Sequence, residues 1–212
     1  MTKKQGIRAL IYLLGMMITA LGINVLLRGE LGAGAWDTTI YNFSQLATIT
    51  LGTSSFIVYI VILTFVMLYN KKLRYVAILI PIIGISLAND FWDIIVFADY
   101  YPAMLWLRFM FFVGGAIILT SGLSLMIVTK YPAMVFDELT LSFMRLLRID
   151  SFFKARIIIE LIAIVLAIIF GVMASIGFGA VSYGSLFLAF VVGPMIEFQL
   201  HILKRLLKPI LV

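Results

Sequence analysis

The sequence predicts an all-α membrane protein in which six transmembrane helices form two inverted repeats of three helices. Each repeat also holds a short amphipathic or re-entrant helix. Three observations predict this fold. Hydrophobic residues make up 64% of the 212 residues and charged residues 12%, which is about half the charged share of a soluble domain. The basic residues lie between long apolar runs, and the second half of the chain repeats the pattern of the first.

Composition also bounds the chemistry. Most of the surface of a small globule must face water, and its core could not hide this many apolar residues. Lipid is therefore the solvent that suits this composition. The chain has no cysteine and a single histidine, His201, which argues against disulfides, thiol catalysis and His-based metal sites. We expect one membrane domain over 1–212, with repeat 1 over about 1–100, repeat 2 over about 101–203 and a basic tail over 204–212. No cofactor is expected.

Six apolar stretches are long enough to cross a bilayer, which takes about 20 helical residues. The first follows the charged start MTKKQGIR and has no A-x-A-like cleavage site, so we interpret it as an uncleaved helix. The predicted spans are 8–28, 53–70, 75–97, 103–129, 153–174 and 181–203.

Two shorter and more polar stretches, 33–49 and 133–149, are predicted as amphipathic helices that lie at the interface or enter the membrane part-way. If the N-terminus is cytoplasmic, the outer side carries only Arg28 and Arg108 of the 16 basic residues. This bias fits the positive-inside rule and predicts that both termini are cytoplasmic. The net charge of +6 is therefore a topology signal, and no nucleic-acid partner is expected.

The repeat becomes visible when the chain is shifted by 100 residues. Rare residue types then coincide in one ungapped register. The matches are Arg8 with Arg108, Gly15 with Gly115, Gly22 with Gly122, Ala33 with Ala133, Trp36 with Phe136, Asp37 with Asp137, Phe43 with Phe143 and Leu46 with Leu146. With a gap, Asp90-Phe91 matches Glu197-Phe198. Three spans per repeat make the second repeat inverted, as in many secondary transporters. A duplication retained only for packing is the alternative.

Several of these motifs resemble the YczE/YyaS/YitT-like family of bacterial integral membrane proteins. They are GAGAWD after the first predicted helix, PAMVFD after the fourth, and the glycine-rich 177–184 stretch that leads to Gly193-Pro194. The resemblance covers nearly the whole chain and implies a multi-pass protein of the bacterial cytoplasmic membrane. It implies no substrate.

Ionisable residues inside predicted spans are the candidates for a substrate or ion site, because charge in a membrane is costly. Asp37 and Asp137 each begin a short helix, where they could cap the helix or point toward a central site. Asp90 and Asp93 share one helical face and could pair with Arg108. Glu197 is the counterpart of Asp90.

Glu160 is the last candidate. It lies one turn from Arg156, and an ion pair between the two is the plain interpretation. Next to Glu197, Gly193-Pro194 could kink or break the last span and free backbone groups. The riskiest expectation is that Asp90 and Glu197 line one cavity near the midplane.

The sequence therefore predicts a small secondary transporter that is coupled to protons or cations and works by alternating access. The alternative is a non-transporting partner, or a regulatory or substrate-binding subunit of a larger complex. An enzyme is not expected, because no Ser/His pair, metal-ligand spacing or phosphate loop occurs. The expected partners are the lipid bilayer and an unknown small molecule or ion, and a homodimer is left open.

Overall fold

The computed structural model describes residues 3–132 and 134–211, and every regular element in these ranges is helical. Six helices are long and apolar enough to cross a membrane, and they overlap all six predicted spans. The chain is therefore a multi-pass membrane protein. Ala133, which the repeat pairs with Ala33, lies outside the described residues. Five of the long helices are α1 (Lys3–Gly29), α3 (Leu51–Asn70), α5 (Leu105–Val128), α7 (Phe152–Met173) and α8 (Tyr183–Leu211), and the sixth is the stretch Leu73–Phe97, with α4 (Leu79–Asp90) at its centre. A 3-10 helix, Leu73–Ile78, precedes α4, and a π-helix, Phe91–Phe97, follows it.

The two short helices begin and end 100 residues apart. They are α2 (Ala35–Ala47) and α6 (Val135–Leu147). Each is closed by a residue in the left-handed region, Thr48 and Arg148, both at φ 53° and ψ 43°. Left-handed residues are uncommon outside glycine. Their recurrence at the same offset shows that the two halves share local backbone geometry as well as sequence.

Helix α2 is buried inside the bundle, so the expectation of a helix lying at the membrane interface does not describe it. It packs against α7, and polar side chains hold it there. The Thr39 hydroxyl donates to the carbonyl of Ala163 at 2.7 Å, and the Asn42 amide donates to the carbonyl of Ala167 at 2.7 Å. Asn42 also accepts from the N–H of Ala180 at 3.0 Å. Such bonds satisfy polar groups that lipid would leave without partners.

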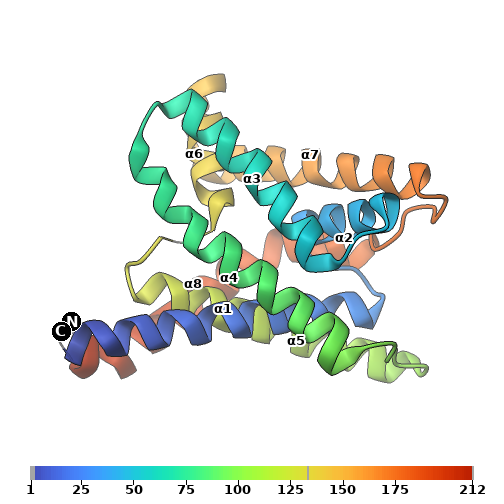
Figure 1. Cartoon of the computed structure of the whole chain (residues 1–212), viewed down its shortest axis with the longest axis horizontal. Helices are drawn as coiled ribbons and strands as arrows, with labels where there is room; N and C mark the ends of the chain where they lie inside the picture. The colour runs from blue at the N-terminus through green and yellow to red at the C-terminus, as the bar shows by residue number, and fades with distance from the viewer. Residues whose placement is uncertain (1–2, 133, 212) are drawn as a thin grey trace.

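Helices α1 and α5 form the closest helix pair in the fold and run antiparallel along one another (Figure 1). Glycines allow the close approach, because a side chain at any of four positions would strike the facing helix. Gly15 faces Met126 and Gly115 faces Leu26, while Gly22 faces Leu119 and Gly122 faces Thr19. The contacts are reciprocal: exchanging each residue for its partner 100 positions away reproduces the same set.

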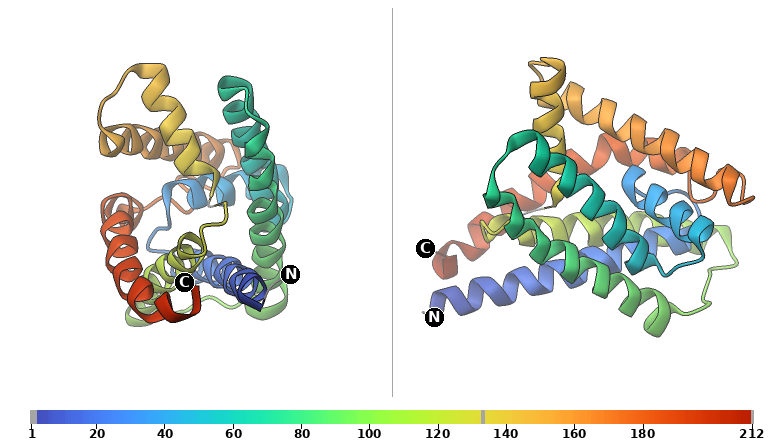
Figure 2. Two further views of the ribbon diagram at one scale, coloured as in Figure 1. Left: turned by 90° about the vertical axis from the view of Figure 1, so that its left-hand side faces the viewer. Right: turned by 45° about the horizontal axis from the view of Figure 1, so that its top comes forward.

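The two halves differ in how their last two long helices pack. In the first half, α3 and α4 lie directly against each other. In the second half, α8 packs on α5, and among the described residues it makes no comparable contact with α7. Figure 2 shows the result in its left view: α3 and α4 form one wall, whereas α7 and α8 stand apart on the opposite side.

Candidate functional site

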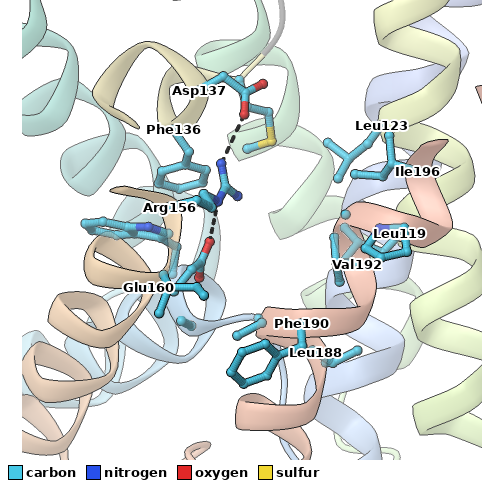
Figure 3. Close-up of a pocket in the computed structure, with 18 of the residues that line it drawn as sticks. Leu119, Leu123, Phe136, Asp137, Arg156, Glu160, Leu188, Phe190, Val192 and Ile196 are labelled. Atoms are coloured by element: carbon cyan, nitrogen blue, oxygen red, sulfur yellow. Dashed lines mark hydrogen bonds and ion pairs between the residues drawn. The ribbon is translucent and has the colours of Figure 1, made fainter. Parts of the chain in front are cut away.

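A cavity of about 490 Å³ occupies the space between α7 and α8. Its inner wall is formed by the first residues of α2 and α6 and by Leu119 and Leu123 of α5 (Figure 3). The volume is typical of small-molecule sites, which span about 300–1,000 Å³. Most of the lining is apolar, but three charged side chains, Arg156, Glu160 and Asp137, converge on one side (Figure 3).

One arginine organises these charges. Arg156 of α7 donates from Nε to Glu160 at 2.8 Å and pairs through a terminal nitrogen with Asp137 of α6 at 3.0 Å (Figure 3). The ion pair expected between Arg156 and Glu160 is thus present. The Glu160 side chain is 10% exposed and the Asp137 side chain 51% exposed, so the triad runs from the buried interior to the surface. It also ties α6 to α7.

Asp37 lies at the deep end of the cavity and is 8% exposed. It is the third residue of α2, and its carboxylate accepts a hydrogen bond from the backbone N–H of Gly34, the N-cap residue. This is the backward hydrogen bond of a capping box. Asp37 forms no ion pair within residues 3–132 and 134–211. Its partner is therefore the end of α2 rather than a cation.

Glu197 lines the cavity from α8 and is exposed. Of the kink or break expected at Gly193-Pro194, the break is absent, because α8 continues through both residues as one helix. Proline still removes one hydrogen bond. Pro194 has no N–H to offer the carbonyl of Phe190, which also belongs to a cavity-lining residue.

The two remaining candidates lie elsewhere. Asp90 accepts from the N–H of Gly52 at 2.6 Å and from the hydroxyl of Thr50 at 2.9 Å, so it caps α3 and does not line the cavity. Asp93 pairs with Arg28 at 2.5 Å. The alternative partner, Arg108, pairs instead with Glu30 at 2.8 Å.

Sequence reasoning nominated carboxylates and missed the aromatic part of the site. Trp36 and Phe136 line the cavity, as do Phe152, Phe153 and Phe190. The match of Trp36 with Phe136 in the repeat was the available signal. The structure thus brings together Asp37, Asp137, Glu160 and Glu197 with an aromatic wall. Such a site can bind a charged molecule with an apolar body, but it offers no nucleophile beside a base.

Comparisons with known proteins agree with the resemblance seen in the motifs. The model of a family of unknown function (DUF6198) matches residues 6–201. The chain is also 23% identical over 194 residues to the uncharacterized protein YyaS of Bacillus subtilis (strain 168), an alignment that covers 92% of each chain. No solved structure matches the chain. Since the family model spans nearly the whole sequence, the chain belongs to the DUF6198 family and is similar to YyaS.

Proposed function

We propose that this protein is a small secondary transporter in which two inverted repeats alternately close on a central site. The observation that carries the proposal is the unequal packing of two otherwise matching halves around a cavity of about 490 Å³. Alternating access requires two equivalent gates that are never open at the same moment.

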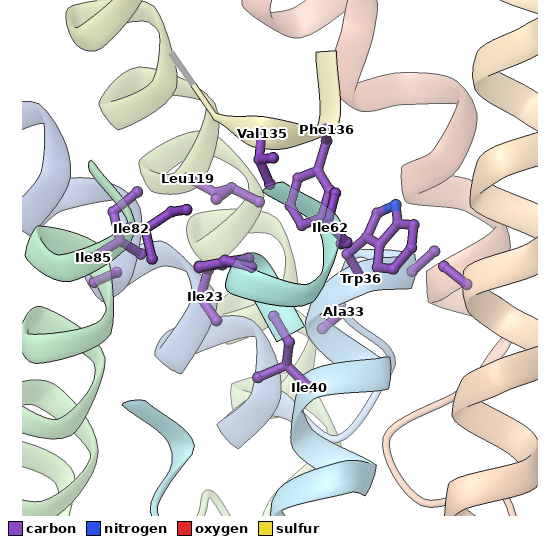
Figure 4. Packing of buried hydrophobic residues seen from close by; sticks show 14 of the residues in the cluster. Ile23, Ala33, Trp36, Ile40, Ile62, Ile82, Ile85, Leu119, Val135 and Phe136 are labelled. Atoms are coloured by element: carbon purple, nitrogen blue, oxygen red, sulfur yellow. The ribbon is translucent and has the colours of Figure 1, made fainter. Parts of the chain in front are cut away.

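The reciprocal contacts of α1 and α5 support the inverted arrangement. Positions 15, 19, 22 and 26 of α1 face the equivalents of 26, 22, 19 and 15 in α5. Contacts that run in opposite order belong to an antiparallel pair. A two-fold axis that relates antiparallel helices is perpendicular to both, and for membrane-crossing helices it lies in the membrane plane. Trp36 and Phe136, equivalent in the repeat, stack on each other with ring centroids 5.0 Å apart, as expected beside such an axis (Figure 4).

The closed gate is the contact between α3 and α4. Asp90 of α4 bonds the first turn of α3, and the backbone of Gly52 touches α4 directly, since a side chain there would strike the carbonyl of Ser86. The open gate is the space between α7 and α8. Its counterpart of Asp90 is Glu197, which forms no ion pair among the described residues. Closure would bring Glu197 toward the first turn of α7.

Orientation decides which side of the membrane the cavity serves. The basic residues favour cytoplasmic termini. The start of α7 then lies on the cytoplasmic side, and the start of α3 on the outer side. The cavity would accordingly open to the cytoplasm, with the Asp90 contact as the outer gate.

Single cysteines test this proposal cleanly because the natural chain has none. Ile157→Cys lines the cavity, and Ser86→Cys lies buried under the closed gate. An impermeant thiol reagent should modify Ile157→Cys from the cytoplasmic side, and Ser86→Cys slowly and only from the outside. Ile117→Cys, on an exposed apolar stretch of α5, serves as the lipid-facing control and should stay unmodified. Reaction of both gate cysteines from one side would refute alternating access.

One observation favours the second candidate, a partner subunit without transport. Only 6% of the most apolar stretch of α8 is buried, against 56% for α1. A second membrane protein seated on α8 would cover this face. If so, Ile157→Cys would be protected in native membranes and would become reactive after purification.

A further inference from the structure

We propose that the cavity between α7 and α8 binds an organic cation, that is, a positively charged nitrogen or phosphorus centre on an apolar body. The inference rests on the proposed function and adds the class of substrate to it. The size of the cavity comes first. About 490 Å³ is far more than an inorganic ion or a proton carrier needs, and it suits a small organic molecule.

The charged groups of the cavity determine whether the bound molecule is a cation or an anion. Two features would favour an anion, namely the N-terminal ends of α2 and α6 and the guanidinium of Arg156. Each already has a carboxylate. Asp37 and Asp137 stand in the first turns of the two helices, and Arg156 is shared between Asp137 and Glu160. Among the described residues that line the cavity, no positive group is left to receive an anion.

The remaining groups of the cavity are ones that attract a positive charge. Four carboxylates line the cavity with one arginine, and Glu197 has no ion-pair partner among the described residues. The carbonyl of Phe190 lacks its helical donor because of Pro194. Five aromatic side chains stand in the same lining, namely Trp36, Phe136, Phe152, Phe153 and Phe190. Aromatic faces attract cations and accept apolar groups, so they suit both parts of an organic cation.

Tetraphenylphosphonium is a suitable probe because tetraphenylborate has nearly the same shape and the opposite charge. The full chain, in lipid nanodiscs, is equilibrated with each ion, and binding to empty nanodiscs is subtracted. We expect saturable binding of tetraphenylphosphonium, a raised melting temperature, and no specific binding of tetraphenylborate. Glu197→Gln, at an exposed position, should weaken the cation's affinity about tenfold. Asp99→Asn, which removes an exposed carboxylate outside the cavity, should leave it unchanged.

Equal binding of the two ions would overturn the inference, and so would an affinity that Glu197→Gln does not alter. These results are separate from the cysteine test of alternating access, which uses no ligand. A chain with alternating accessibility but no preference for the cation would remain a transporter of another substrate class. Preference for the cation without alternating accessibility would indicate a binding subunit, and the proposed function would fail alone.

Discussion

The first turns of α3 and α7 occupy equivalent places in the two halves and behave differently. Counted from the N-cap residues Thr50 and Ser151, Gly52 corresponds to Phe153. Gly52 lets α3 lie directly on α4, whereas the Phe153 side chain is 58% exposed and faces the cavity. In the first half the two helices are in direct contact at this turn, whereas in the second half a phenyl ring stands at the corresponding position. Under the proposed function, this ring would have to move before α7 and α8 could close on each other.

The same count places Ser55 and Tyr59 where Arg156 and Glu160 stand. The first half fills this position with a hydroxyl and an aromatic ring, and the second half with an ion pair. Charge inside a bundle is costly, and at this position only the second half carries it, in an ion pair that lines the cavity. Substitutions at these positions test whether the two halves differ in this way.

Loss of Arg156 should have the largest effect. Arg156→Ala leaves Glu160 unpaired in a largely buried position. We expect a loss of about 2–3 kcal/mol in the free energy of unfolding, less than the roughly 3–5 kcal/mol of a fully buried pair because Arg156 is 29% exposed. The double variant Arg156→Leu with Glu160→Leu should recover most of the stability. Unfolding in mixed detergent measures both. If the double variant is as unstable as the single one, the ion pair is not the reason for the loss.

A methyl group at position 52 should have the second largest effect on stability. Gly52→Ala would collide with the carbonyl of Ser86 and the carboxylate of Asp90, at a cost of about 1–3 kcal/mol. The control in the other half is another helical glycine, Gly193→Ala, because nothing lies within 4 Å of that position. It should be neutral or stabilising by up to about 1 kcal/mol. Similar losses in both variants would mean that the halves pack alike in the membrane.

The smallest expected effects on stability are those of replacing Asp90 and Glu197. Asp90→Asn weakens the cap on α3 and should cost about 1 kcal/mol. Glu197→Gln removes a carboxylate that has no ion-pair partner among the described residues, and the melting temperature should stay within error of the parent protein. A destabilised Glu197→Gln would show that Glu197 has a structural partner.

More of the fold than of the candidate site could be predicted from the sequence. The lengths of the apolar runs and the offset of 100 located the six long helices and the limits of α2 and α6, because bilayer thickness and local capping act within one segment. Sequence reasoning could not foresee that Asp90 would cap α3 while Glu197 lines a cavity. Each is followed by a phenylalanine, and the difference comes from whether α3 or α7 lies close enough to be capped. That is a tertiary property.

It also missed the aromatic wall of the cavity. Aromatic residues are common throughout this apolar chain, and no local pattern marks the few that surround a cavity. By contrast, the Arg156–Glu160 pair followed from a spacing of four residues on one helix. Interactions within an element could be predicted, whereas those between distant elements required the structure.

The exchange of the two gates is the central claim, and paired spin labels test it most directly. Labels at Thr53 and Leu87 span α3 and α4, and labels at Lys154 and Phe198 span α7 and α8; all four positions are exposed. Distances are measured by pulsed electron resonance in nanodiscs, for the parent sequence and for Asp90→Asn. We predict that loosening the first gate lengthens the Thr53–Leu87 distance and, in the same sample, increases the share of short Lys154–Phe198 distances. A Lys154–Phe198 distribution that stays unchanged while the first gate opens would contradict the account.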